Sequence, residues 1–111
     1  MEIMGPLQGP KMLLARMPIQ ECSSIFSEDI PRATQKRLND HNSGRLLLEK
    51  CLQTWGLPLD SLEVLRTEHR APYLSWISGV WRNQPLPGIS LGHCEDWAVC
   101  ALVELSLIHI S

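Results

Sequence analysis

The sequence predicts a single α+β domain, on the basis of three observations. The chain has 111 residues, enough for one domain and too few for two, and 44% of them are hydrophobic. One segment repeats apolar residues at helical spacing, with Leu47, Cys51 and Trp55 at positions i, i+4 and i+8. Two apolar runs further along, 89–91 and 97–104, are typical of buried strands. Helix and strand are therefore both expected.

The first segments are expected to be an arm and a strand. Residues 1–11 contain two Gly-Pro breakers, which predict a flexible N-terminal arm. Residues 12–19 are mostly apolar and favour a strand. Because proline cannot donate a hydrogen bond to a neighbouring strand, Pro18 places this strand at the edge of a sheet.

A helix is expected to follow. Ser27 to Pro31, SEDIP, has a capping serine, acids for a first turn and a proline near the first helical position, so it predicts a helix start. Gly56 and Pro58 predict its end. Between them, residues 39–44 (NDHNSG) are poor helix formers. We therefore expect the helix to break there, or two helices to meet.

The middle of the chain predicts less regular structure. Residues 62–67 fit either a strand or a short helix, and 69–88 resemble a loop because they are dense in proline, glycine and tryptophan. Trp55 and Trp97 are expected in the core, since large aromatics near leucines usually lie there. The places of Trp76 and Trp81 stay open.

Charge and cysteine content restrict the function classes. A formal net charge of −2 gives no general attraction to nucleic acid or to an anionic membrane, so we expect neither as a partner. A cluster of basic residues could still form a local anion site. Its members are Arg32, Lys36, Arg37 and Arg45. The four cysteines form no CxxC pair and lie in or beside apolar segments, and no apolar run reaches ~18 residues, so we expect a reduced, cytoplasmic protein.

A polar segment lies between the last two apolar runs. It extends from Ser90 to Asp96 and includes His93. A histidine on a turn between buried strands is rigidly held, can carry charge near neutral pH and can donate to a phosphate, with Ser90 or backbone amides donating beside it. A zinc site built from His93, Cys94 and Cys100 would lack a fourth ligand and a familiar spacing.

Several short motifs resemble, in order, those of the two-lobed phosphopantetheinyl transferases that activate carrier proteins. The resemblance covers roughly residues 12–104. It rests on the following segments: Leu14-Ala15, the SED sequence at Ser27, Lys36-Arg37, Ser43-Gly44-Arg45, the Arg-Ala-Pro loop at Arg70 to Pro72, and the Ser-x-Ser-His-like element at Ser90 to His93 before Trp97.

The resemblance implies a fold, a ligand and a reaction. The fold would be a small, mainly antiparallel sheet packed by one or two helices, the first lobe of a pseudo-duplicated enzyme. That enzyme moves phosphopantetheine from coenzyme A to a serine of an acyl or peptidyl carrier protein, with Mg²⁺ bridging the pyrophosphate. The residues implied to bind coenzyme A here are His93, Ser90, Arg70, Lys36, Arg37 and Arg45.

The sequence also departs from the family pattern. Gly92 replaces the second serine of the Ser-x-Ser-His-like element, so one hydroxyl is missing. The carboxylates that bind Mg²⁺ in the family would lie downstream of Glu104. The last seven residues, 105–111 (LSLIHIS), resemble a translated adapter sequence from DNA library preparation. We therefore expect 12–104 to be an N-terminal lobe without the metal site, and expect no transferase activity from it.

Other interpretations remain open for each feature. The basic residues of the helix would serve equally as a solvated face, Arg70 could pair with Glu68 or Glu63, and His93 could be structural. The alternative function is a non-catalytic domain that grips a protein partner with the Trp- and Pro-rich segment 72–87. A fragment that does not fold stably is a third possibility.

Overall fold

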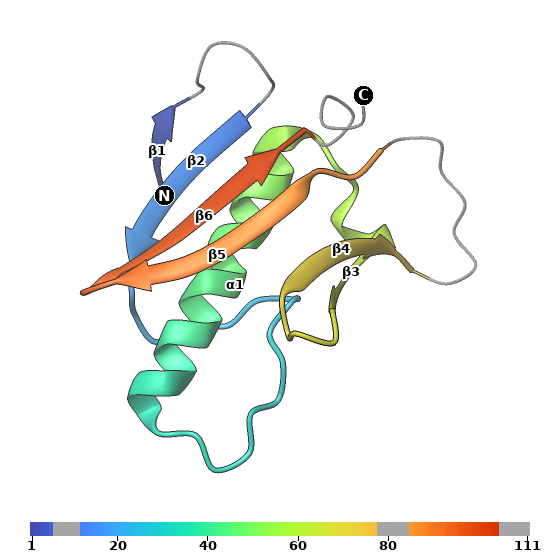
Figure 1. The fold of residues 1–111 in the computed structure, drawn as a ribbon. Coiled ribbons are helices and arrows are strands. Elements are labelled where there is room, and N and C mark those ends of the chain that lie inside the picture. Colours follow the sequence, from blue (N-terminus) through green and yellow to red (C-terminus); the bar gives the residue numbers. More distant parts are fainter. Residues whose placement is uncertain (6–11, 78–84, 105–111) are drawn as a thin grey trace.

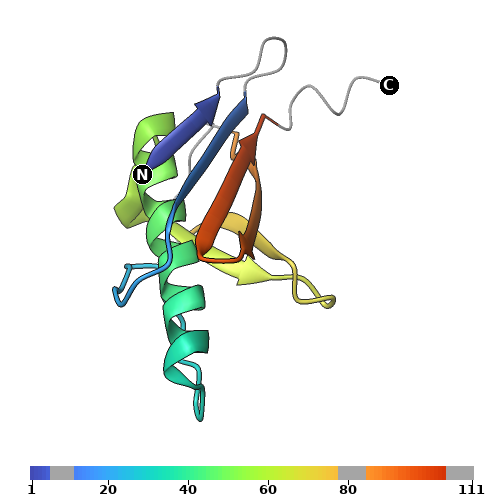
Figure 2. The same ribbon diagram turned by 90° about the vertical axis from the view of Figure 1, so that its left-hand side faces the viewer.

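The core of the protein is a four-stranded antiparallel sheet with one long helix on one face. The computed structural model describes residues 1–5, 12–77 and 85–104. The strand order is β1-β2-β6-β5. The bounds of these strands are Glu2–Gly5 for β1, Met12–Pro18 for β2, Gly88–Cys94 for β5 and Trp97–Val103 for β6. Figures 1 and 2 show helix α1 lying across one side of this sheet. The expected α+β class, with a small and mainly antiparallel sheet, is confirmed.

The core is formed by every second side chain of the two central strands, β2 and β6. Buried and half-buried residues alternate through β2 and β6, as expected for a sheet with one covered face. The buried side chains face α1. They are Leu13, Ala15 and Met17 of β2 and Ala98, Cys100 and Leu102 of β6. Helix residues Leu47, Leu48, Cys51 and Leu52 complete this core.

Trp97 is the exception among the expected core residues. It belongs to the half-buried set of β6, on the sheet face that points away from α1, where the Arg16 guanidinium lies 4.1 Å from the centre of its ring. The prediction of a core position is therefore wrong for Trp97. Trp55 and Trp76 do pack against the core.

Helix α1, Gln35–Trp55, is continuous. Its N-cap is Thr34, whose hydroxyl accepts the Arg37 N–H at 3.2 Å. The predicted start at Ser27 is thus wrong, because the chain from 19 to 34 runs as a loop alongside the helix. The predicted end is confirmed. Gly56 adopts φ 96, a left-handed conformation that glycine reaches without a Cβ clash, and its N–H donates to the carbonyls of Leu52 and Gln53.

The expected break at residues 39–44 is absent because the loop supports the helix there. The Ser43 side chain is fully buried, accepts the Gln20 N–H at 2.9 Å and donates to the Gln20 carbonyl at 3.0 Å. Ser24 of the same loop donates to the Arg45 carbonyl and to the Glu49 carboxylate, two and six residues after Ser43 in the helix. These contacts satisfy side chains that would otherwise compete with helical hydrogen bonds.

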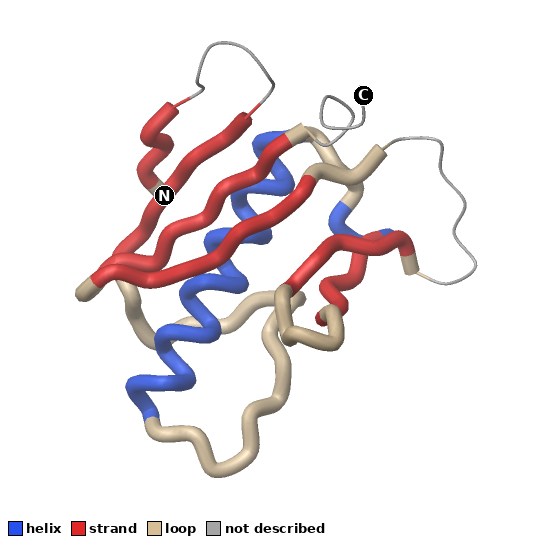
Figure 3. The backbone as a smooth tube through the Cα atoms, in the orientation of Figure 1, coloured by secondary structure: helices blue, strands red, loops and turns tan. Residues whose placement is uncertain are grey.

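A second, two-stranded sheet lies beside the first. A 3₁₀ turn, Leu59–Ser61, leads into β3, Leu62–Arg66, which pairs antiparallel with β4, Pro72–Trp76. Figure 3 shows this hairpin next to β5, with which β4 is in contact. Residues 62–66 are therefore a strand, and the expectation of a loop from 69 onward is wrong for 72–76.

Two further expectations about strands need correction. Residues 2–5 pair with β2, although the sequence placed them in the flexible arm. Strand β2 lies between β1 and β6, not at an edge. Pro18 is tolerated because it ends the strand, two residues beyond the last position paired with β1.

Some sequence interpretations fall outside the described residues. They concern the rest of the arm, 6–11, the adapter-like tail, 105–111, and 78–84 of the Trp- and Pro-rich segment, which include Trp81. Within the described ranges, no helix combines the length and the apolar character that crossing a bilayer requires.

Candidate phosphate-binding pocket

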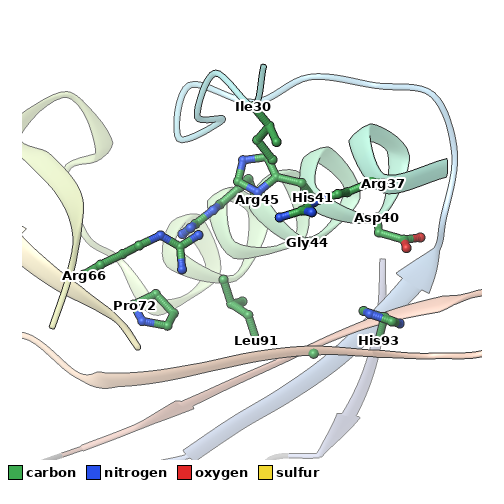
Figure 4. A pocket seen from close by; sticks show the side chains of 11 residues that line it. Ile30, Arg37, Asp40, His41, Gly44, Arg45, Arg66, Pro72, Leu91 and His93 are labelled. Atoms are coloured by element: carbon green, nitrogen blue, oxygen red, sulfur yellow. The ribbon is translucent and has the colours of Figure 1, made fainter. Parts of the chain in front are cut away.

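A pocket of about 340 Å³ opens between the N-terminal half of α1, strand β5 and the turn end of the β3–β4 hairpin. Figure 4 shows its side chains converging from these elements. We call it the arginine pocket. Its polar lining residues are Arg37, Asp40, His41, Arg45, Arg66 and His93. Its other lining residues are Ile30, Gly44, Pro72, Leu91 and Gly92.

The helix supplies one wall because α1 does not break. Arg37, Asp40, His41, Gly44 and Arg45 occupy positions i, i+3, i+4, i+7 and i+8, which lie on one helical face. A Cβ built on Gly44 meets no atom within 4 Å, so this glycine leaves the wall open between two cationic side chains. One face of the N-terminal half of α1 therefore presents its polar side chains to a single cavity.

Strand β5 supplies the opposite wall. His93 pairs with Ala98 and Leu91 with Cys100, both on the sheet face that packs against α1. In Figure 4 the side chains of His93 and Leu91 point toward the helix. Ser90 pairs with Ala101, on the other face, because residues three apart on a strand point in opposite directions. The side chains of Ser90 and His93 therefore do not converge on one ligand group.

His93 lies within a strand and not on a turn. Strand β5 continues to Cys94, and only Glu95 and Asp96 connect it to β6. Glu95 makes the reversal with φ 55. The polar hinge expected over residues 90–96 is thus reduced to these two residues, while His93 is held by the sheet itself.

Arg45 is the most buried charged group of the pocket. Its relative exposure is 2%, although it lies among the lining residues. Nη2 donates to the Glu28 carboxylate at 2.9 Å, but Nη1 is buried and has no hydrogen-bond partner among the described residues. Burial lowers the pKa of Arg45, and the negative charge of Glu28 opposes that shift. A buried, unpartnered donor of this kind is costly unless a ligand accepts from it.

Arg66 extends into the same pocket from the end of β3. Its Nε donates to both oxygens of Glu28, at 3.2 and 3.3 Å, and its Nη1 donates to the Arg70 carbonyl at 2.8 Å. Arg70 itself forms the turn of the hairpin with φ 66, and its N–H donates to the Thr67 carbonyl. The backbone of Arg70, and not its side chain, thus contributes to the pocket by orienting Arg66.

His41 is neutral in this environment. Its Nε2 accepts the backbone N–H of Glu28 at 2.9 Å, which a doubly protonated ring could not do. Burial lowers the pKa of His41, and the charges of Arg45, Arg66 and Arg37 lower it further, while Glu28 raises it. An anion bound in the pocket would reverse part of this effect and raise the His41 pKa.

Only part of the predicted site comes together in the pocket. Arg37, Arg45 and His93 line it. Ser90 and Arg70 are exposed elsewhere, and Lys36 is exposed on a neighbouring face of α1. Sequence reasoning missed His41 and Arg66. The signal for His41 was its spacing from Arg37 and Arg45, which becomes visible once the helix is treated as continuous.

The arrangement suits an anionic ligand. Three arginines face the cavity against one lining carboxylate, Asp40, with Glu28 behind the arginines. His93 and the neutral His41 also line it. The apolar side chains Ile30, Leu91 and Pro72 would contact an uncharged part of the ligand. Within the described ranges no group of three or more His, Cys, Asp and Glu side chains is placed to hold a metal ion.

Comparisons of the chain with protein-family models, with curated proteins and with solved structures gave no match.

Proposed function

We propose that the arginine pocket binds the phosphate groups of coenzyme A, and that the chain is the coenzyme-binding lobe of a phosphopantetheinyl transferase. The observation that supports this most is Arg45, a buried arginine at a pocket wall with an unpartnered Nη1. Arginine presents several donors in a fixed plane, which matches the oxygens of a phosphate. Arg45 and His93 also belong to the motifs that resemble the family.

The strength of such binding can be judged from its contacts. A hydrogen bond to a charged group contributes roughly 1.5 to 3 kcal/mol. Three or four such bonds from Arg37, Arg45, Arg66 and His93 would approach the −8 kcal/mol or so that corresponds to micromolar affinity, before ordering costs. The pocket therefore has enough donors for a ligand with several phosphate oxygens.

The wider activity follows from the resemblance. The reaction would transfer phosphopantetheine to a serine of an acyl or peptidyl carrier protein, with Mg²⁺ on the pyrophosphate. We place the protein in the cytoplasm because all four of its cysteines, Cys22, Cys51, Cys94 and Cys100, are free. The residues of the pocket account for the binding of the nucleotide part alone, so the experiment that tests the proposal measures binding.

Coenzyme A is expected to bind more tightly than dephospho-coenzyme A, because the 3′-phosphate supplies two more negative charges to the arginines. The loss of one or two charge-assisted hydrogen bonds predicts affinity about 10-fold to 100-fold weaker for the dephospho form. The preference should shrink as salt rises. Isothermal titration calorimetry at two salt concentrations measures both effects. Equal and negligible binding of the two compounds would contradict the proposal.

A second candidate function is favoured by one observation. Leu65 and Tyr73 are cross-strand partners on the β3–β4 hairpin and are 37% and 42% exposed, and nearby Ile77 is 37% exposed. Exposed apolar side chains gathered on one hairpin are typical of protein contacts. This supports the interpretation of 72–87 as a segment that binds a protein. Equal and negligible binding of coenzyme A and dephospho-coenzyme A in the titration above would favour this second function.

A further inference from the structure

Glu28 lies behind the arginine pocket and joins two of its walls. It belongs to the loop before α1 and is not among the lining residues. Its carboxylate accepts from Arg45 of α1 at 2.9 Å and from Arg66 of β3 at 3.2 Å. Its backbone N–H donates to His41 at 2.9 Å. One residue thus connects the loop, the helix and the hairpin at the site of proposed binding.

The contacts of Glu28 leave the ligand-binding donors free. The Glu28 carboxylate accepts a hydrogen bond from Nη2 of Arg45, while Nη1 of the same guanidinium has no partner among the described residues. It uses Nε of Arg66, while Nη1 of Arg66 donates to the Arg70 carbonyl. Arg45 is therefore held through one nitrogen of its guanidinium group and Arg66 through two. A fixed orientation of this kind reduces the ordering that a ligand would otherwise have to impose.

Two guanidinium groups directed at one cavity also repel each other. The Arg66 charge lowers the pKa of Arg45, whereas the Glu28 charge raises it. A carboxylate shared by both groups offsets that repulsion without occupying the cavity. Glu28 is about one third exposed, so its charge does not itself carry a large burial cost.

We propose that Glu28 is a positioning residue that holds Arg45 and Arg66 in the orientation needed to bind a phosphorylated ligand. This inference rests on the proposed function only in that the pocket must bind phosphate groups. It does not depend on coenzyme A being the natural ligand.

For the affinity of Glu28→Gln, the positioning role and a simple charge argument predict changes in opposite directions. Glu28→Gln removes a negative charge near the pocket, which by charge alone strengthens the binding of an anion. If Glu28 positions the arginines, the variant should bind inorganic pyrophosphate at least about tenfold more weakly than the unaltered chain, the equivalent of losing one charge-assisted hydrogen bond. Calorimetric titration of the full chain with pyrophosphate measures the difference.

Asp29→Asn is the matched control. It removes the same charge one residue away, from an exposed side chain outside the pocket lining. Its affinity for pyrophosphate should stay equal or rise slightly. An affinity in Glu28→Gln equal to or above that of the unaltered chain would overturn the positioning role, as would a loss of equal size in Asp29→Asn.

A double-mutant cycle separates positioning from a general structural effect. In an Arg66→Gln background, Glu28→Gln should cost much less affinity than it does alone, because one of the two groups it positions is gone. Full additivity would contradict the proposal. If Glu28→Gln does not fold, Glu28→Asp replaces it throughout. The carboxylate of Glu28→Asp is one methylene too short to reach both arginines, so binding should weaken severalfold, and unchanged binding would overturn the proposal.

The failure of this inference and the failure of the proposed function give different results. If coenzyme A and dephospho-coenzyme A bind equally while pyrophosphate binding still depends on Glu28, the positioning role holds and the ligand assignment fails. If coenzyme A is preferred but Glu28→Gln binds pyrophosphate with the affinity of the unaltered chain, the ligand assignment holds and the positioning role fails. Absence of pyrophosphate binding by the unaltered chain would overturn the positioning role directly.

Discussion

Arg45→Met is expected to weaken coenzyme A binding about 10-fold to 100-fold while changing the stability of the protein little. The loss of affinity corresponds to one or two charge-assisted hydrogen bonds from the guanidinium. Stability should change by less than about 1 kcal/mol, because the methionine keeps the apolar stem and removes a buried donor that has no partner among the described residues. Glu28 keeps Arg66 as its ion-pair partner. Calorimetry and thermal unfolding measure the two quantities.

Lys36→Met is the control for this variant. It removes the same charge from the same helix, but Lys36 is exposed and outside the pocket lining. Its affinity for coenzyme A should fall by no more than about twofold, since an exposed charge is screened by solvent and salt. Equal losses in the two variants would mean that coenzyme A responds to the overall charge of the helix and not to the pocket.

Leu102→Ala is expected to destabilise the protein by about 2 to 5 kcal/mol. Leu102 is fully buried in β6 and pairs with Leu13 of β2 on one side and Ile89 of β5 on the other. Its removal leaves a cavity at the centre of the sheet face that packs against α1. Because β5 carries His93, the loosened sheet should also weaken coenzyme A binding. Chemical denaturation monitored by circular dichroism measures the free energy of unfolding.

Leu65→Ala serves as the comparison for the core substitution. Leu65 is 37% exposed on β3, so truncating it should cost less than about 1 kcal/mol. Similar losses of stability at the two positions would contradict the assignment of the core to the interface between α1 and the four-stranded sheet.

Strands β2 and β6 and the end of the helix could be predicted because their signals are local, whereas β1 and the central place of β2 were not predicted. Strand β6 shows its burial through an apolar run, and Gly56 marks the end of α1 by its backbone freedom. The continuity of α1 could not be predicted from propensity. It depends on the buried Ser43 bonding to Gln20, 23 residues earlier in the chain. The sequence of residues 39–44 alone does not show that Gln20 will bond to Ser43.

The expectation of a break at residues 39–44 also hid His41 as a member of the candidate site. A helix broken at residues 39–44 separates Arg37 from Arg45, whereas a continuous helix places both on one face with His41 between them. The separation of Ser90 from His93 was predictable in principle, because side chains alternate along any strand. Arg66 was not, since its position depends on the Arg70 turn and on Glu28, which only the folded chain brings together.

The most direct test of the account is a crystal structure of the chain with coenzyme A. We expect a phosphate oxygen of the coenzyme within hydrogen-bond distance of Arg45 Nη1, the donor that is unpartnered among the described residues, and further phosphate oxygens at Arg66 and His93. Coenzyme A bound on another surface, with Arg45 Nη1 still unpartnered or bonded to the protein itself, would contradict the assignment of the arginine pocket as the phosphate site.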